Sequence, residues 1–228
     1  MDKIDEETGI EETDIEEKYV VNIEETDMVN IFTNIYEKKL WGDKNQNCPG
    51  LNISGSNLNY NNKYILFVKE FIQNNNINVV VDLGCGDFEI GHELFKDLNV
   101  IYNGFDVYNK IIDYHNSVTK NLSYFWSFDN LDCYNEKEKI PFGDLCIIKD
   151  VFQHWNYNLT YNLLNYLIQS KKFKYILICN CSYQTNDSQH INTGVFRPIN
   201  KNFYPLNEFE LIKVFSYNTK DVYLYENK

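Results

Sequence analysis

The 228-residue chain lacks alanine altogether and has a single arginine, Arg197, whereas asparagine occurs 33 times. Isoleucine, lysine, tyrosine and phenylalanine are also abundant. These abundant residues have codons rich in A and T, so we attribute the bias to the coding DNA and not to function. Because alanine and arginine are among the strongest helix formers, their scarcity weakens any helix prediction that rests on propensity alone.

Other absences exclude whole classes of protein. No apolar stretch approaches the roughly 20 residues of a transmembrane helix, and the acidic start of the chain does not resemble a secretory signal. The six cysteines are not clustered, which argues against a disulfide framework and favours a cytoplasmic protein. They also lack the partners and spacing of a zinc site, so we expect no metal.

The net charge of −12 is unevenly distributed. Residues 1–30 contain 12 Asp and Glu and 2 Lys, whereas the rest of the chain contains 21 Asp and Glu and 19 Lys and Arg. We therefore predict an acidic, flexible tail over residues 1–26 and a single domain over residues 27–228, which begins with a helical cap at 27–76. The domain has no basic stripe, which argues against a nucleic-acid substrate.

Short apolar runs alternate with amphipathic segments along this domain. Strands are expected over residues 78–83, 100–107, 122–128, 144–149 and 175–181, followed by a hairpin of 208–216 and 221–226. Helices are expected over residues 27–40, 88–98, 109–117 and 159–170 and around 65–72. The pattern predicts an α/β fold with a seven-stranded, mostly parallel sheet, an antiparallel C-terminal hairpin and helices on both faces.

The first of these strands ends in the sequence Val-Asp-Leu-Gly-Cys-Gly-Asp-Phe, residues 81–88. Gly84 and Gly86 allow a tight turn that passes close beneath a ligand. Glu89 stands where a phosphate-binding loop has its third glycine, and its charge would oppose a pyrophosphate at the start of the next helix. A positively charged ligand suits this acidic loop better. Asp106 ends the second strand about 20 residues later, where an acid can accept hydrogen bonds from ribose hydroxyls or cap the following helix.

These features resemble the first motif of class I, Rossmann-like methyltransferases that depend on S-adenosylmethionine. The resemblance extends over about residues 30–228 and includes the segment 144–154 and the C-terminal hairpin. A narrower branch of this family is also similar, and its shared segments are 31–36, 41–42, 54–57, 85–88, 149–154 and 192–197. The chain departs from these patterns because its Ser-Gly loop lacks a proline and Asp87 replaces a third glycine.

The resemblance implies that the chain binds S-adenosylmethionine. Asp129 would meet the adenine amino group, with Asp132 as the alternative. The other residues implied to hold the cofactor are Asp82, Gly84, Cys85, Gly86, Asp87, Asp106, Val107 and Lys149.

Two residues are candidates for catalysis. Asp150 and His154 lie four positions apart, so one helical turn would place them on one side. The carboxylate would then hold the imidazole in the tautomer that takes a proton from the acceptor. Alternatively, Asp150 only caps a helix and His154 only bonds the backbone.

The acceptor is expected to be a small molecule, preferably a sugar, a nucleotide sugar or another hydroxylated or amino metabolite. Arg197 would bind an anionic group, Trp41 and Tyr36 would form a lid, and Asn192 would line the pocket. The alternatives for these residues are a structural salt bridge, packing in the core and a surface position. The alternative functions are methylation of a protein or RNA and a non-catalytic binding or regulatory subunit.

Overall fold

The computed structural model describes residues 27–42, 57–122, 124–183 and 190–227. The predicted acidic tail lies outside these described residues, as does most of the Ser-Gly loop.

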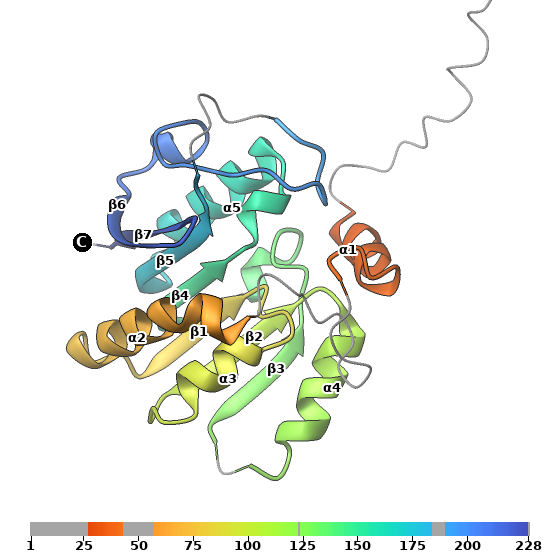
Figure 1. Cartoon of the computed structure of the whole chain (residues 1–228), viewed down its shortest axis with the longest axis vertical. Helices are drawn as coiled ribbons and strands as arrows, with labels where there is room; N and C mark the ends of the chain where they lie inside the picture. The colour runs from red at the N-terminus through yellow and green to blue at the C-terminus, as the bar shows by residue number, and fades with distance from the viewer. Residues whose placement is uncertain (1–26, 43–56, 123, 184–189, 228) are drawn as a thin grey trace, which may run out of the picture.

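One seven-stranded sheet forms the centre of the protein, with the order β3-β2-β1-β4-β5-β7-β6 (Figure 1). The first five strands in this order are parallel, and β7 lies antiparallel between β5 and β6. The predicted sheet and its C-terminal hairpin are therefore confirmed. The strands are β1 (Val79–Leu83), β2 (Ile101–Asp106), β3 (Trp126–Asn130), β4 (Gly143–Lys149), β5 (Phe173–Cys181), β6 (Ile212–Tyr217) and β7 (Lys220–Glu226).

Helices cover both faces of the sheet, as predicted. The helices are α1 (Met28–Glu37), α2 (Leu58–Asn74), α3 (Glu89–Phe95), α4 (Asn109–Thr119) and α5 (Tyr157–Ser170). Helices α2, α3 and α4 bury their apolar residues against one face, and α5 covers the other. Adjacent residues of a strand point to opposite faces of the sheet. Val80 and Leu145 pack in the core on the side of α2, α3 and α4, and Val81 and Cys146 pack in the core on the side of α5.

Asparagine and aspartate caps help to define the helices of this alanine-free chain. Asp27, Asn57 and Asn156 each precede a helix and accept a hydrogen bond from the backbone N–H three residues later. Such a bond satisfies one of the donors that the first helical turn leaves unpaired, and it stabilises a helix by about 1 kcal/mol.

Several elements differ from the prediction: β6 begins at Ile212 and not at residue 208, and α3 ends at Phe95 and not at residue 98. The third strand spans Trp126–Asn130 and not residues 122–128, because it lies at the sheet edge, where Leu122 and Phe125 are exposed. The segment 27–76 does not form one cap, because α2 packs beside α3 on the sheet whereas α1 stands apart from it (Figure 1). Helix α1 and the turn that follows it lie over the strand ends, and α2 contributes Tyr64 to the pocket there.

The strand order reverses between β1 and β4. From β1 the chain continues to β2 and β3 on one side, and it then returns to build β4 and β5 on the other. Ligands of parallel sheets bind in the crevice beyond the strand ends at such a point. In the part of the chain that the structure describes, no helix combines the length and apolarity needed to cross a membrane.

Candidate functional site

A pocket lies at this switch point, between the carboxyl ends of β1, β2 and β4 and the helix α1. Its space, including the opening to solvent, is about 1160 Å³. The predicted residues that line it are Tyr36, Trp41, Asp82, Gly84, Cys85, Gly86, Asp87, Asp106, Val107, Lys149, Asp150 and His154.

The glycine loop after β1 has a backbone that other residues adopt with difficulty. Gly84 has φ +82°, and a Cβ atom added to it would lie 2.5 Å from Cγ2 of Val151. The N–H groups of Gly84 and Cys85 donate to the carbonyl oxygen of Phe105 at 2.8 and 2.9 Å. Gly86 has φ +55°. The loop is therefore tied to β2 and presents its backbone to the pocket.

The Asp106 carboxylate, at the end of β2, is bonded on both oxygens. Its Oδ1 accepts from the N–H of Tyr108 at 3.0 Å, and its Oδ2 accepts from the N–H of Gly86 at 3.1 Å and from the hydroxyl of Tyr36 at 3.5 Å. Burial raises the pKa of Asp106, although these hydrogen bonds oppose the shift. The residue thus orders the start of α4 and faces the pocket at the same time.

A histidine that sequence reasoning left unassigned supports the loop from behind. His115 of α4 is 2 % exposed, and its Nε2 lies 2.7 Å from the carbonyl oxygen of Gly86. Burial lowers the pKa of His115. Because a carbonyl oxygen only accepts, Nε2 is the donor in this hydrogen bond. No sequence signal pointed to this contact, because it depends on how α4 packs.

Asp82 also lines the pocket, near the end of β1. Its Oδ2 accepts a hydrogen bond of 2.8 Å from the hydroxyl of Tyr102. Burial raises the pKa of Asp82 to about 6, although the Tyr102 hydroxyl opposes the shift. Its carboxylate is therefore costly to keep charged without a cation beside it.

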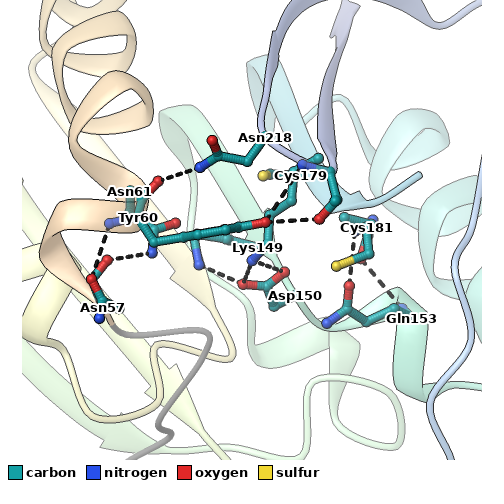
Figure 2. A network of polar contacts seen from close by, with 12 residues as sticks. Asn57, Tyr60, Asn61, Lys149, Asp150, Gln153, Cys179, Cys181 and Asn218 are labelled. Carbon is teal, nitrogen blue, oxygen red and sulfur yellow. Dashed lines mark hydrogen bonds and ion pairs between the residues drawn. The ribbon is translucent and has the colours of Figure 1, made fainter. Parts of the chain in front are cut away.

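Asp150, which follows β4, is bound by two lysines, Lys149 and Lys220. Figure 2 shows Asp150 beside Lys149. Lys149 Nζ lies 2.5 Å from Asp150 Oδ2, and Lys220 Nζ lies 2.7 and 2.5 Å from its two oxygens. Burial alone would raise the pKa of Asp150, but the two ammonium groups hold it below its usual range. Lys220 is 4 % exposed and was not predicted, because the sequence does not show that β7 pairs with β5.

His154 also lines the pocket, but the predicted hydrogen bond between Asp150 and His154 is not formed. The segment between them is a single turn of 3-10 helix, and the carboxylate turns toward the lysines instead. Burial lowers the pKa of His154 to about 4, although Asp150 opposes the shift. Its Nδ1 atom is buried without a hydrogen-bond partner among the described residues.

The neighbouring glutamine fixes the other side of this ring. Oε1 of Gln153 accepts a hydrogen bond of 2.9 Å from the N–H of Cys181, a contact visible in Figure 2. The amide nitrogen of Gln153 therefore points toward Nε2 of His154, at 3.4 Å. Because an amide N–H₂ only donates, Nε2 is the accepting side of the ring.

Helix α1 bridges the two halves of the pocket. On one side Glu37 accepts hydrogen bonds from Lys110 at 2.5 Å and from the Tyr108 hydroxyl at 3.0 Å. On the other side the Trp41 ring, just after α1, packs on His154 with a centroid distance of 4.7 Å. The Tyr36 ring lies between these contacts and stacks on Tyr108 at 4.6 Å.

Asp129, the residue expected to meet the adenine amino group, does not lie at the pocket. Asp129 lies within β3, is exposed and does not line the pocket, because the strand continues to Asn130. Asp132, the predicted alternative, does line the pocket. Its Oδ1 also accepts from the N–H groups of Tyr134 and Asn135, at 3.1 and 3.0 Å, so it shapes the loop after β3.

Arg197 and Asn192 are not at the pocket, contrary to the prediction. Arg197 is 3 % exposed, its Nη1 donates to the carbonyl oxygen of Trp155 at 2.6 Å, and its guanidinium lies 4.8 Å from the Tyr157 ring centroid. These contacts hold the chain around Arg197 against the start of α5. Asn192 is exposed, and its carbonyl oxygen accepts from Val195 in a turn at 3.2 Å.

Apolar residues complete the lining, and sequence reasoning had assigned none of them a role. They come from α1, α2, α3, β4 and the loops after β3 and β4, and they include Met28, Phe32, Tyr64, Leu131 and Trp155. Their amphipathic spacing is typical of any buried residue, so it gave no signal of a pocket. Among the residues that the structure describes, no group of three or more His, Cys, Asp or Glu side chains is arranged to hold a metal ion.

Comparison with known proteins supports the fold. No family model matches the chain, and no curated protein matches it. The magnesium protoporphyrin IX methyltransferase ChlM from Synechocystis PCC 6803, crystallised with bound SAH, is similar with a TM-score of 0.57 and 11% identity over 89% of this chain and 98% of that one.

The methyltransferase domain of bacterial CtHen1-C has a TM-score of 0.55 and 13% identity over 75% of this chain and 98% of its own. The 16S rRNA methylase ArmA has a TM-score of 0.51 and 12% identity over 88% and 98%. The chain therefore has the methyltransferase fold that the sequence resemblance implied. Two of these neighbours are named for different substrates, magnesium protoporphyrin IX and 16S rRNA.

Proposed function

We propose that the protein binds S-adenosylmethionine and transfers its methyl group to a small acceptor that carries a hydroxyl or amino group. One observation carries this proposal: the glycine loop and the Asp106 carboxylate meet in a pocket whose described lining holds five aspartates and one lysine. The cofactor carries a sulfonium and an ammonium group, which an acidic pocket attracts. The same lining would repel the pyrophosphate of a dinucleotide.

The residues present fit the parts of this cofactor. Asp106 would accept hydrogen bonds from the ribose hydroxyls, and Asp82, with its otherwise unfavourable buried charge, would bind the ammonium group. Gly84 and Gly86 leave backbone space for the methionine part. Asp132 is better placed than Asp129 to meet the adenine amino group. The remaining proposed contacts are Cys85, Asp87, Val107 and Lys149.

The cofactor supplies a methyl group that its sulfonium makes reactive, so the protein mainly has to align the acceptor and exclude water. Helix α1 and Trp41 cover the pocket and would exclude water. His154, which lines the pocket and is uncharged at neutral pH, remains the proposed catalytic group. Asp150 would act through Lys149, which it holds at the pocket wall.

The other functions considered have weaker support. A sugar or nucleotide sugar was preferred partly because Arg197 was expected to bind an anionic group, and that residue does not reach the pocket. The acidic lining is also unfavourable for an RNA acceptor. A non-catalytic binding subunit would not need an intact glycine loop beside Asp106, and both are present.

Calorimetric titration with S-adenosylmethionine and S-adenosylhomocysteine tests the proposal. We expect both to bind, and we expect Asp106→Asn to weaken binding by roughly 10- to 100-fold, because hydrogen bonds to a charged group contribute about 1.5–3 kcal/mol. Asp129→Asn is the matched control, since Asp129 is exposed and outside the pocket. If the folded wild-type protein binds neither compound, the proposal is wrong and the regulatory alternative takes its place.

A further inference from the structure

In the lining that the structure describes, Lys149 is the one lysine, and its neighbours do not cancel its charge. Its Nζ atom lies 2.5 Å from Oδ2 of Asp150. The same carboxylate also binds Nζ of Lys220, at 2.7 and 2.5 Å. Two ammonium groups therefore share one carboxylate, and the three side chains together have a surplus positive charge.

This surplus charge reaches the pocket through Lys149. Lys220 is 4 % exposed and does not line the pocket, whereas the Lys149 side chain is 14 % exposed and does. The Tyr64 ring of α2 lies beside it, with the Lys149 Nζ atom 5.9 Å from the ring centroid. An ammonium group can donate three hydrogen bonds, so the bond from Lys149 to Asp150 does not exclude a bond to a ligand.

Asp82 and Lys149 project from the same face of the sheet at the carboxyl ends of adjacent strands. Asp82 of β1 pairs in register with Ile147 of β4, and Lys149 follows Ile147 by two residues. With about 4.8 Å between strands and about 3.3 Å per residue, the Cα atoms of Asp82 and Lys149 lie roughly 8 Å apart. Burial raises the pKa of Asp82, and the Lys149 ammonium is among the groups that oppose this shift. The pocket wall thus carries a negative and a positive group close together.

This pair of opposite charges matches the amino-acid end of S-adenosylmethionine, where one carbon bears both an ammonium and a carboxylate group. The described lining offers that carboxylate five aspartates, which repel it, and one lysine, which attracts it. A charge that leaves water without a partner is costly. A ligand that brings a carboxylate into this pocket therefore requires Lys149, and a ligand without one does not.

We infer that Lys149 binds the carboxylate of the cofactor's methionine part, beside Asp82, which would bind its ammonium group. This inference rests on the proposed function. Asp150 and Lys220 act as positioning residues behind Lys149. Asp150 holds the Lys149 ammonium at the pocket wall, and Lys220 supplies the second positive charge, so that Asp150 does not neutralise Lys149.

The test is calorimetric titration with S-adenosylhomocysteine and with its decarboxylated form, which keeps the ammonium group and lacks only the carboxylate. We expect the wild-type protein to bind S-adenosylhomocysteine about 10- to 100-fold more tightly, because the carboxylate adds a charge-assisted hydrogen bond. Lys149→Met should remove this preference and leave the affinity for the decarboxylated compound unchanged. The unchanged affinity would also show that the pocket of the variant is intact.

Two further variants make the test specific. Lys63→Met removes an exposed lysine of α2 that does not line the pocket, so it changes the net charge equally and should keep the preference. Lys220→Met should reduce the preference in part, because Asp150 is then bound by Lys149 alone. An unchanged preference in Lys149→Met, or an equal loss in Lys63→Met, would overturn the inference.

A carboxylate on the acceptor is the other group that Lys149 could bind. Benzoate titrated into the protein saturated with S-adenosylhomocysteine distinguishes the two sources, and we expect no binding that depends on Lys149. If benzoate binds and Lys149→Met abolishes its binding, or if wild type binds both adenosyl compounds equally, the inference is wrong and cofactor binding stands. If neither adenosyl compound binds, the proposed function fails first, and this inference fails with it.

Discussion

Replacement of Gly84 by alanine should destabilise the protein for two separable reasons. A side chain at positive φ costs roughly 1–2 kcal/mol. The new Cβ would also lie 2.5 Å from Cγ2 of Val151, and overpacking of this kind costs about 1–3 kcal/mol. Valine is β-branched and stiff, so it relieves the overlap poorly. The sum, roughly 2–5 kcal/mol, is a large part of a domain's usual stability of about 5–15 kcal/mol.

Gly86→Ala isolates the first reason. Gly86 also has positive φ, at +55°, but the nearest atom to an added Cβ is the Tyr36 hydroxyl at 4.0 Å. We therefore expect Gly86→Ala to cost only the backbone part, about 1–2 kcal/mol. Urea denaturation followed by circular dichroism measures both variants on the same scale.

A double-mutant cycle isolates the second reason. Val151→Ala removes the Cγ2 atom that the new side chain would meet. In that background Gly84→Ala should lose about 1–3 kcal/mol of its cost, the overlap part. The reasoning is refuted if Gly84→Ala costs no more than Gly86→Ala, or if Val151→Ala leaves its cost unchanged.

The affinity for S-adenosylhomocysteine should fall as the pH is lowered through about 6, the raised pKa of Asp82, because protonation removes the charge that binds the ligand's ammonium group. Calorimetry between about pH 5 and pH 8 measures this, and a dependence that is equally steep in Asp82→Asn contradicts the assignment. Lys220→Met should cost about 1–3 kcal/mol of unfolding free energy near neutral pH, because it removes a buried partner of Asp150 while Lys149 remains. Asp150 has a lowered pKa, so its ion pairs stabilise the fold above the usual aspartate pKa, and this stabilisation is lost as the pH falls through the lowered pKa. The difference in unfolding free energy between wild type and variant should therefore shrink in urea denaturation at acid pH. Lys213→Met is the control on the same hairpin, since Lys213 is half-exposed and lies 3.7 Å from its partner, and a loss as large as that of Lys220→Met would show that the burial of Lys220 is unimportant.

The fold was predictable because local pattern and topology rules agree in this chain. The run of valines before Asp82 and the apolar run of β4 are typical of strands buried on both faces, and the helices between them impose a parallel sheet. The third strand was misplaced because it is the edge strand, where apolar residues such as Phe125 remain exposed and the pattern is weak.

The part of the candidate site nearest the glycine loop could be anticipated, because its spacing is fixed by one strand, one turn and the next strand. The rest depends on contacts between distant segments. Lys220 reaches Asp150 only because β7 inserts beside β5, and Trp41 reaches His154 only because α1 lies over the strand ends. The prediction for Arg197 failed for a related reason. Because Arg197 is the single arginine, a special role was expected, but the sequence does not show where its side chain points.

The contact between Tyr36 and Asp106 has a thermodynamic consequence. The Tyr36 hydroxyl occupies the same Oδ2 atom of Asp106 that would receive a ribose hydroxyl, and it is carried by a helix whose other contacts are Glu37 with Lys110 and Trp41 with His154. A ligand that takes this oxygen either shares it with Tyr36 or displaces it. In both cases the free energy of placing α1 over the pocket contributes to the binding constant. Two ligands bound in the pocket would therefore change each other's affinity by the same factor.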